Sequence, residues 1–308
     1  MAWEDGRSGY YNIYAKTSTD AGATWSPDTA LTSEAHASET PSVVVVDSDV
    51  YVVWSAFFIN AYEIWFRRST DAGTTWDPSV RLVQTLDIGS GQPCVAAADS
   101  CVNVVWHDDM YANFEIIQKR SSDRGLTWGD AVRLTSHAGT SQSPSIAARD
   151  SLVHLVWEDD RYGLGDIFYL RSTNSGASWE PETRLTTDTA ASQFPSVVAG
   201  DDIVHVVWQD YRDGNNEVYY KRWLDATGTG SGIIPAPPVG ALTPSSNPFV
   251  SSTRIRSCEH ERFIVTDALG RPAGVCRGAC VGQNLQPGVY FLRRAERAGA
   301  PLRLVKLF

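Results

Sequence analysis

The chain has 308 residues, 43 % of them hydrophobic and 20 % charged, which is enough for a sizeable core and unlike the composition of a disordered protein. The formal net charge is −10, divided between −16 on residues 1–239 and +6 on residues 240–308. The acidic body argues against nucleic acid as a partner, because phosphate would be repelled, and no run of 18 apolar residues predicts a transmembrane helix.

Tryptophan marks an internal repeat that begins at the N-terminus. Two series of tryptophans recur every 51 or 52 residues. The first series is Trp3, Trp54, Trp106, Trp157 and Trp208, and the second is Trp25, Trp76, Trp128 and Trp179. Self-similarity at a fixed period of this size is typical of solenoids, propellers and repeat arrays.

Each repeat contains four short segments of β-branched and aromatic residues. In the repeat that opens at Pro41, we expect strands directly after the proline, at residues 51–54, at 63–67 and at 80–83, separated by polar turns. Pro93, Pro144 and Pro195 open the later repeats. No stretch has helical periodicity. Four antiparallel strands make one propeller blade, so the sequence predicts an all-β fold with a β-propeller of four-stranded blades.

A turn of the pattern Ser-x-Asp-x-Gly-x-Thr-Trp, with small variations, joins the expected third and fourth strands. It spans residues 18–25, 69–76, 121–128 and 172–179. We expect Asp20, Asp71, Asp123 and Asn174 to accept backbone N–H groups of their own turns, glycine to supply a positive φ, and Trp25, Trp76, Trp128 and Trp179 to pack beneath. The role predicted for these residues is structural.

On these turns, residues 1–223 resemble the Asp-box (BNR-repeat) propellers, the group that includes sialidases. The resemblance implies that the Asp boxes lie on the face away from the ligand site, and that the ring has six blades. Five blades are recognisable here; the first lacks its opening strand and the fifth lacks an Asp box and a fourth strand. Either the N-terminal strands complete the fifth blade, or an upstream portion of a six-bladed ring precedes this sequence.

A second pattern follows the first tryptophan of each repeat, in the loop between the second and third strands. It supplies the candidate ligand-binding residues Asp5 and Arg7, Asp108, Asp159 and Arg161, and Asp210 and Arg212. A polar residue stands nine positions after each tryptophan: Asn12, Glu63, Glu115, Asp166 and Glu217. Successive hairpins lie at opposite ends of a blade, so these loops are expected on the face opposite the Asp boxes.

Two interpretations of the arginines are open. Arg7, Arg161 and Arg212 could form an anion site comparable with the arginine cluster that grips the carboxylate in sialidases. Alternatively, each arginine pairs with the aspartate two residues before it, or with the acid of the third strand, and stiffens its own loop. The second interpretation is favoured, because positions repeated around a ring reflect repeated structure, whereas catalysis needs unlike residues in one place.

Other features weigh against catalysis. Resemblance to sialidases implies a tyrosine nucleophile activated by a carboxylate, an acid/base aspartate and an early Arg-Ile-Pro motif, yet the sequence has no Arg-Ile-Pro. Tyr10, Tyr162 and Tyr211 lie in the expected loops but look like ordinary repeat tyrosines. No cofactor or metal is predicted; the pairs at 108–109 and 159–160 could hold calcium, although solvated acids are the simpler interpretation.

The C-terminal part reads as a separate domain. Residues 224–246 are rich in Gly, Pro, Ser, Thr and Ala and predict a linker, and residues 247–308 alternate short strands with Gly and Pro turns, which predicts a small Ig-like β-sandwich. The order Asn-Pro-Phe at 247–249, Asp267 before Gly-Arg at 270–271, Pro-Gly-Val-Tyr at 287–290 and Lys-Leu at 306–307 is similar to the C-terminal sorting domain of the type IX secretion system.

That resemblance implies that residues 247–308 are read by the type IX secretion machinery and that the protein reaches the surface or the medium of a bacterium. It also implies a cleaved N-terminal signal, which residues 1–7 do not resemble. We therefore expect this sequence to be an N-terminally truncated fragment.

The sequence thus predicts an exported, surface-associated or secreted propeller, non-catalytic, that binds a glycan or a protein on the face opposite the Asp boxes. The alternative is an exo-sialidase or related glycoside hydrolase with catalytic residues missing upstream.

Overall fold

The computed structural model describes residues 1–33, 36–58, 61–83, 89–200 and 203–224 and, beyond them, only strands between residues 253 and 306. The chain divides into two compact units, Met1–Ile233 and Ile234–Phe308. Every regular element among the described residues is a β-strand. Those residues contain no helix long and apolar enough to span a membrane. The predicted all-β fold is confirmed.

Five antiparallel sheets follow one another along the described part of the first unit, and we number them blades 1 to 5. Blade 1 contains β1 (Ala2–Asp5), β2 (Asn12–Ala15) and β3 (Thr29–Ala30). Blade 2 contains β4 (Ser38–Val46), β5 (Asp49–Phe58), β6 (Ala61–Ser69) and β7 (Val80–Arg81). Blade 3 contains β8 (Ser90–Ala98), β9 (Cys101–Asp108), β10 (Glu115–Ser121) and β11 (Val132–Arg133).

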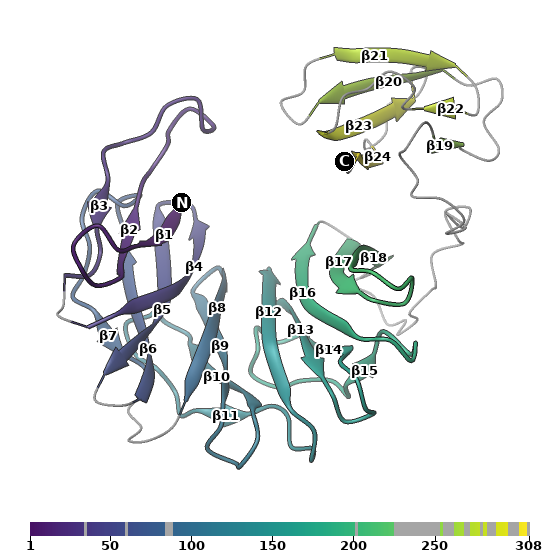
Figure 1. Cartoon of the computed structure of the whole chain (residues 1–308). Helices are drawn as coiled ribbons and strands as arrows, with labels where there is room; N and C mark the ends of the chain where they lie inside the picture. Colours follow the sequence, from purple (N-terminus) through teal and green to yellow (C-terminus); the bar gives the residue numbers. More distant parts are fainter. Residues whose placement is uncertain are drawn as a thin grey trace. The chain divides into compact units, whose positions relative to one another are not determined.

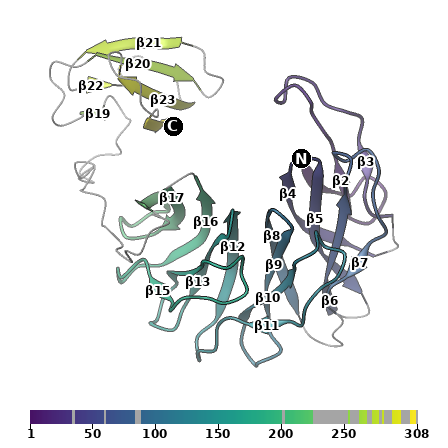
Figure 2. The ribbon, with the colours of Figure 1, turned by 180° about the vertical axis from the view of Figure 1, so that it is seen from behind.

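Blade 4 contains β12 (Ser141–Arg149), β13 (Leu152–Asp159), β14 (Asp166–Ser172) and β15 (Thr183–Arg184). Blade 5 contains β16 (Ser192–Ala199), β17 (Ile203–Asp210) and β18 (Glu217–Leu224). The first strands of blades 2 to 5 contact one another in turn, and both views show the five sheets in an arc with blades 1 and 5 at its ends (Figures 1 and 2). This is the predicted propeller: within the described ranges, blades 2 to 4 have four strands, and blades 1 and 5 have three.

The second unit has two sheets among its described strands. One is four-stranded, in the order β21 (Pro272–Arg277), β20 (Arg262–Asp267), β23 (Gly288–Arg294) and β24 (Leu302–Lys306). The other pairs β19 (Thr253–Arg254) with β22 (Cys280–Val281). Leu224, the first residue of the linker predicted at 224–246, is the last residue of β18; the rest of that linker and part of the sorting-domain motifs lie outside the described residues.

The hydrophobic core of the propeller lies between consecutive blades. Four buried clusters fill the four interfaces, and each contains side chains from two neighbouring sheets. Trp54, Trp106 and Trp157 of the first tryptophan series are 2 %, 1 % and 0 % exposed in these clusters. The tryptophan period is therefore the period of blade packing, since blades 2 to 5 each insert one indole of this series into an interface.

The Asp-box turns lie together at one end of the blades. In blade 2, the Asp71 carboxylate accepts hydrogen bonds from Thr75 N (2.8 Å), Thr75 Oγ1 (2.6 Å) and Ser69 Oγ (2.7 Å). Ala72 N, on the same turn, donates to Ser48 O of the hairpin between the first and second strands. The equivalent bond recurs in blades 3 and 4, so the Asp boxes share one face, as predicted.

The Asp-box turns of blades 2 to 4 also join each blade to the blade before it. Trp128 packs against Phe66 with ring centroids 4.9 Å apart, and Trp179 Nε1 donates to Gln118 Oε1 at 3.0 Å. Gly125 (φ +79) approaches Phe66 so closely that an added Cβ would lie 2.6 Å from the ring. Trp25 belongs to blade 1, which has no preceding blade among the described residues, and it is 43 % exposed.

Candidate functional site

The loops between second and third strands lie at the end of the blades opposite the Asp boxes. The start of each first strand lies beside them: Ser141 N donates to Phe114 O of the preceding blade and Ser192 N to Gly165 O. We call this surface, formed by those loops and the first-strand starts, the loop face. All the loop residues singled out from the sequence lie on it.

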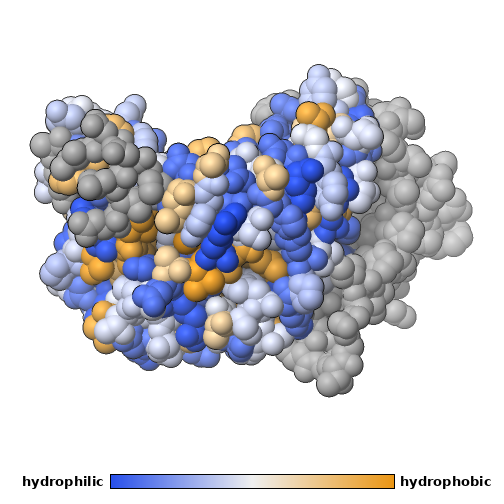
Figure 3. Space-filling model, turned by 90° about the horizontal axis from the view of Figure 1, so that it is seen from below, coloured by the Kyte–Doolittle hydropathy of each residue, from blue (hydrophilic) through white to orange (hydrophobic). Residues whose placement is uncertain are grey.

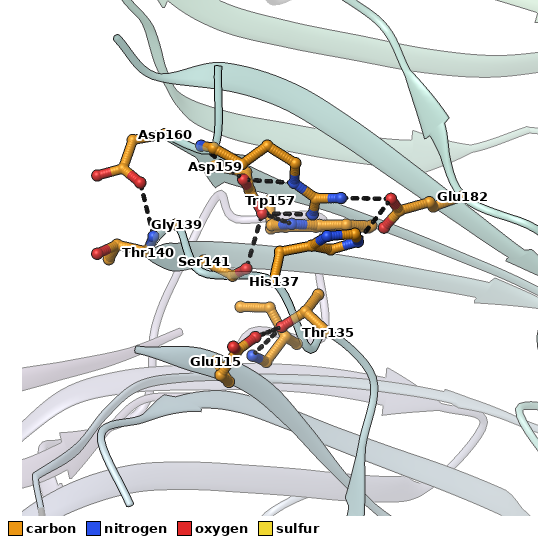
Figure 4. A network of polar contacts seen from close by, with 12 residues as sticks. Glu115, Thr135, His137, Gly139, Thr140, Ser141, Trp157, Asp159, Asp160 and Glu182 are labelled. Atoms are coloured by element: carbon orange, nitrogen blue, oxygen red, sulfur yellow. Dashed lines mark hydrogen bonds and ion pairs between the residues drawn. The ribbon is translucent and has the colours of Figure 1, made fainter. Parts of the chain in front are cut away.

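In blade 4, Asp159 is the centre of a polar network on the loop face (Figure 4). Its carboxylate accepts hydrogen bonds from Ser141 Oγ (2.8 Å) and Trp157 Nε1 (3.2 Å), and from the Nε (2.7 Å) and Nη2 (2.6 Å) of Arg161. Nη1 of Arg161 contacts Glu182, which lies directly before β15 and also pairs with His137 at 3.2 Å.

This network is nearly closed to solvent. The Asp159 side chain is 0 % exposed and that of Arg161 is 7 % exposed. Burial raises the pKa of Asp159, but hydrogen bonds from Arg161 and Ser141 lower it by more, so that the pKa lies below its usual value. Arg161 is likewise held in its charged form, since burial lowers its pKa and the Asp159 and Glu182 contacts raise it by more. A buried, fully paired ion pair of this kind stiffens a loop.

The same arrangement recurs in blades 1, 3 and 5 with graded completeness. The Arg7 side chain, which is 49 % exposed, contacts Asp5 (2.5 Å) and Asp28 (2.6 Å). Arg212 contacts Asp210 through Nε (2.7 Å) and Nη2 (2.6 Å) and is 29 % exposed. In blade 3, Asp108 accepts from Ser90 Oγ and Trp106 Nε1 without an arginine.

The geometry therefore pairs each arginine with the aspartate two residues earlier. Arg7 and Arg161 engage both terminal nitrogens within their own blades, which leaves them little capacity for an exogenous anion. Of these three arginines, and among the described residues, only Arg212 has a terminal nitrogen, Nη1, without a partner. Sequence reasoning missed the acids at positions 28 and 182, because they lie 21 residues from their arginines.

The polar residues nine positions after each tryptophan are also held within the blades. Glu115 is 0 % exposed and takes hydrogen bonds from Arg133 and Thr135 on and beside the fourth strand. Asp166 is held in the same way by Arg184 and Thr186. These carboxylates fasten the outermost strand of the blade to the third strand.

A set of unlike residues, which sequence reasoning missed, lies one position after each tryptophan. They are Glu4, Ser55, His107, Glu158 and Gln209. Glu158 is 4 % exposed; its Oε1 accepts from Gln142 (3.3 Å) and Gln193 (3.1 Å), while the buried Oε2 has no partner among the described residues. Burial lowers the pKa of His107 to about 4, so this imidazole is neutral at pH 7. Variation at one position of an otherwise regular repeat is the sequence signal that could have found them.

Tyr62 and Glu39 make a further polar contact on this face. The Tyr62 hydroxyl donates to Glu39 Oε2 at 3.2 Å, and burial together with the Glu39 charge raises the pKa of the phenol. The pair brings a tyrosine and a carboxylate into hydrogen-bond contact in blade 2, and Tyr62 is not one of the tyrosines singled out at 10, 162 and 211.

Exposed aromatic side chains gather on the loop face. Of the ten that are exposed among the described residues, all but Trp25 and Tyr220 lie there: Tyr10, Tyr11, Phe57, Phe58, Tyr111, Tyr162, Phe194 and Tyr211. Two of these rings make cation–π contacts: the guanidinium of Arg133 lies over the ring of Tyr111, and that of Arg184 over the ring of Tyr162. Figure 3 shows one side of the molecule, where hydrophobic residues form small patches among hydrophilic ones.

A shallow cavity of about 380 Å³ lies where the first strands meet. It is lined by Pro41, Pro93, Pro144 and Pro195 with their neighbours. Each proline follows a residue with φ between 48° and 52°, at a bulge in the first strand. The bulge accommodates proline, which has no N–H to donate to the ladder.

The described residues contain no cluster of three or more His, Cys, Asp or Glu side chains that could hold a metal ion. The two pairs considered for calcium are engaged otherwise. Asp159 is bound by Arg161, and Asp160 accepts from Thr140 N at 2.6 Å; Asp109 accepts from Gly89 N at 2.7 Å.

Comparison with solved structures finds propeller glycoside hydrolases. A mutant of NanB sialidase from Streptococcus pneumoniae is 13 % identical (TM-score 0.45), covering 71 % of this chain and 40 % of that chain. A mutant of Trypanosoma rangeli sialidase is 14 % identical (TM-score 0.47), covering 74 % of this chain and 41 % of that chain. The GH93 α-L-arabinofuranosidase of Fusarium graminearum is 16 % identical (TM-score 0.48), covering 62 % of this chain and 63 % of that chain.

The chain thus spans about two fifths of the length of the two sialidases. It matches no curated protein. The model of the BNR repeat-like domain matches residues 3–206, which is more than half of the chain. The chain belongs to the family of BNR repeat-like domains.

Proposed function

We propose that this propeller is a non-catalytic binding protein and that its ligand is a glycan, bound on the loop face. The observation that carries the proposal is the gathering of exposed aromatic side chains on that face. Sugar rings present apolar C–H faces that stack on aromatic rings, and their hydroxyls pair with amides and carboxylates. Glu158, Gln142 and Gln193 supply such groups on the same face.

The pairing of the arginines supports a neutral rather than an anionic glycan. Arg161 is enclosed by Asp159 and Glu182, so releasing it toward a ligand carboxylate would leave a buried carboxylate unpaired. The amides of Gln142 and Gln193, which are half-buried and oriented by Glu158 Oε1, can pair with the hydroxyls of a neutral sugar.

Binding of the full chain to an array of neutral and acidic glycans tests the proposal. We expect retention on neutral glycans that falls at least tenfold in Tyr162→Ala and in Glu158→Ala. Glu180→Gln, an exposed acid beside the Asp box, should bind as the unaltered chain does. Absence of binding to every glycan, or binding that neither loop-face variant changes, would overturn the proposal; retention of a protein instead would replace the glycan by a protein ligand.

A second candidate function is favoured by the Tyr62–Glu39 contact. A tyrosine in hydrogen-bond contact with a carboxylate can act as the nucleophile of a sialidase-like glycoside hydrolase. The raised pKa of Tyr62 and the pairing of Arg7 and Arg161 within their own blades oppose this function. We expect no turnover of a fluorogenic sialoside; turnover that Tyr62→Phe abolishes and Tyr220→Phe retains would establish the hydrolase instead.

Export is the remaining part of the proposal. It rests on the motifs of residues 247–308 and on the basic charge of that region. Fusing those residues to a reporter that carries a secretion signal, in a bacterium with a type IX system, should bring the reporter to the cell surface or the medium. A reporter that stays in the periplasm would contradict this assignment.

A further inference from the structure

The outer edge of β18 differs from the third strand of every other blade. In blades 1 to 4 the strand equivalent to β18 pairs with a two-residue outer strand. The leucine after each outer strand donates its N–H to the carbonyl of an isoleucine on the inner strand; these isoleucines are Ile13, Ile64, Ile116 and Ile167. Those isoleucines are all 0 % exposed. Val218 holds the same position on β18 and is 66 % exposed. Among the described residues, no strand covers this edge.

Arginine in a loop-face loop occurs together with an acid directly before the fourth strand. Blade 1 has Arg7 with Asp28, and blade 4 has Arg161 with Glu182. Blades 2 and 3 have neither: Phe58 and Met110 replace the arginine, and Ser79 and Ala131 replace the acid. Arg212 in blade 5 therefore lacks the acid that accompanies arginine in the other blades, and its Nη1 has no partner among the described residues.

A second charge on β18 is also without its usual partner. Glu63, Glu115 and Asp166 each pair with an arginine of the fourth strand, namely Arg81, Arg133 and Arg184. Glu217 holds the same position in blade 5 and, within the described part of the chain, accepts only from Asn215, at 2.7 Å. An incoming strand would thus meet a cationic and an anionic group in a defined order.

A cavity of about 390 Å³ lies against this edge. Arg212, Tyr219 and Lys221 line it from blade 5, and Leu185, Thr186 and Asp188 from the end of blade 4. Lys221 Nζ donates to Leu185 O at 3.0 Å, which ties the two walls together. Arg212 is one of the lining residues, and the equivalent arginines of blades 1 and 4 contact the acid directly before the fourth strand.

We propose that the edge of β18 binds an extended peptide of the pattern acid-x-basic-Leu-Thr, supplied by a partner protein, as an added fourth strand. The acid pairs with Arg212, the basic residue two positions later pairs with Glu217, and the strand takes ladder hydrogen bonds from Tyr219 and Tyr220. Residues 182–186 of blade 4 have this pattern and make the corresponding contacts to Arg161 and Asp166. Main-chain pairing supplies affinity and the two charges supply selectivity. The site is independent of the glycan-binding proposal.

The test uses the full chain and a capped synthetic peptide with the sequence of residues 181–187, Pro-Glu-Thr-Arg-Leu-Thr-Thr. Calorimetry should show saturable one-to-one binding, and a peptide with the same composition in scrambled order should not bind. Replacing the peptide glutamate by glutamine should weaken binding at least fivefold, and so should replacing its arginine by alanine.

Variants of the chain assign these losses to single contacts. In Arg212→Gln the glutamate and glutamine peptides should bind equally, and in Glu217→Gln the arginine and alanine peptides should bind equally. Arg7→Gln, in a blade whose edge is already covered, should bind as the unaltered chain does. Equal binding of the native, glutamine and scrambled peptides to the unaltered chain would overturn the proposal without any variant. No binding at millimolar peptide would also overturn it, since the edge would then be closed by the chain itself or by a second copy.

Discussion

Ser38 and Ala56 are paired across β4 and β5, and the Ser38 hydroxyl is buried there without a hydrogen-bond partner among the described residues. In blades 3 to 5 the serine at this position donates to the aspartate that follows tryptophan, at 2.6 to 2.9 Å. Blade 2 has kept the serine and replaced the aspartate by Ala56, so half of a repeated contact remains.

This difference predicts opposite effects of one substitution at equivalent positions. Ser38→Ala should stabilise the propeller by about 1 kcal/mol, because a buried hydroxyl without a partner is removed. Ser141→Ala should destabilise it by about 1 kcal/mol, because Asp159 loses a donor. Denaturant unfolding of both variants measures the difference, and equal effects would show that the hydroxyl of Ser38 is satisfied in solution.

The Asp-box turn of blade 2 predicts a rescue by amide. Asp71→Ala should lower Tm by several degrees, because Thr75 N and Oγ1 and Ser69 Oγ all lose their acceptor. Asp71→Asn should restore most of the loss. In blade 4 the natural Asn174 keeps the backbone bond from Ser178 N and donates to Ser178 Oγ, so the hydroxyl exchanges roles. Thermal melting of the two variants tests this prediction. An Asp71→Asn variant as unstable as Asp71→Ala would show that an amide cannot replace the carboxylate in the Asp box of blade 2.

The Asp boxes also predict a pH dependence. The threonine hydroxyl, followed by the threonine N–H, lowers the pKa of Asp20, Asp71 and Asp123 from 3.8 to about 2. A folded-state pKa below the unfolded one contributes stability above pH 3.8 that is lost as the pH falls through 2. The triple variant with asparagine at these positions should lose less Tm than the unaltered chain when the pH falls from about 5 to about 2. An identical acid dependence would exclude these carboxylates as its source.

Exposure predicts that two of the loop arginines, Arg161 and Arg7, differ in what they contribute to stability. Arg161→Ala should destabilise by about 3 kcal/mol, because Asp159 would remain buried without its ionic partner. Arg7→Ala should leave Tm unchanged within error, since both of its partners remain accessible to water. Urea unfolding of the two variants tests this difference, and equal losses would show that burial does not set the strength of these pairs.

The repeat was readable from the sequence because its signals are local. Trp54, Trp106 and Trp157 recur at a fixed period, and each Asp box closes its turn with residues at most four positions apart, such as Asp71 and Thr75. The hydrogen bonds of an Asp box join residues close in sequence, so a local pattern is enough to reveal them. The strand pattern, the blade repeat and the common face of the Asp boxes followed from them.

The tertiary structure decided which groups satisfy one another across distance. Glu182 reaches Arg161, and Gln193 reaches Glu158, only when strands far apart in sequence lie side by side. No local pattern distinguishes Arg212, whose Nη1 has no partner among the described residues, from Arg161, which engages both terminal nitrogens. The difference arises from the fourth strand, which is present in blade 4 and absent from the described part of blade 5, since the residue directly before that strand is the competing acid.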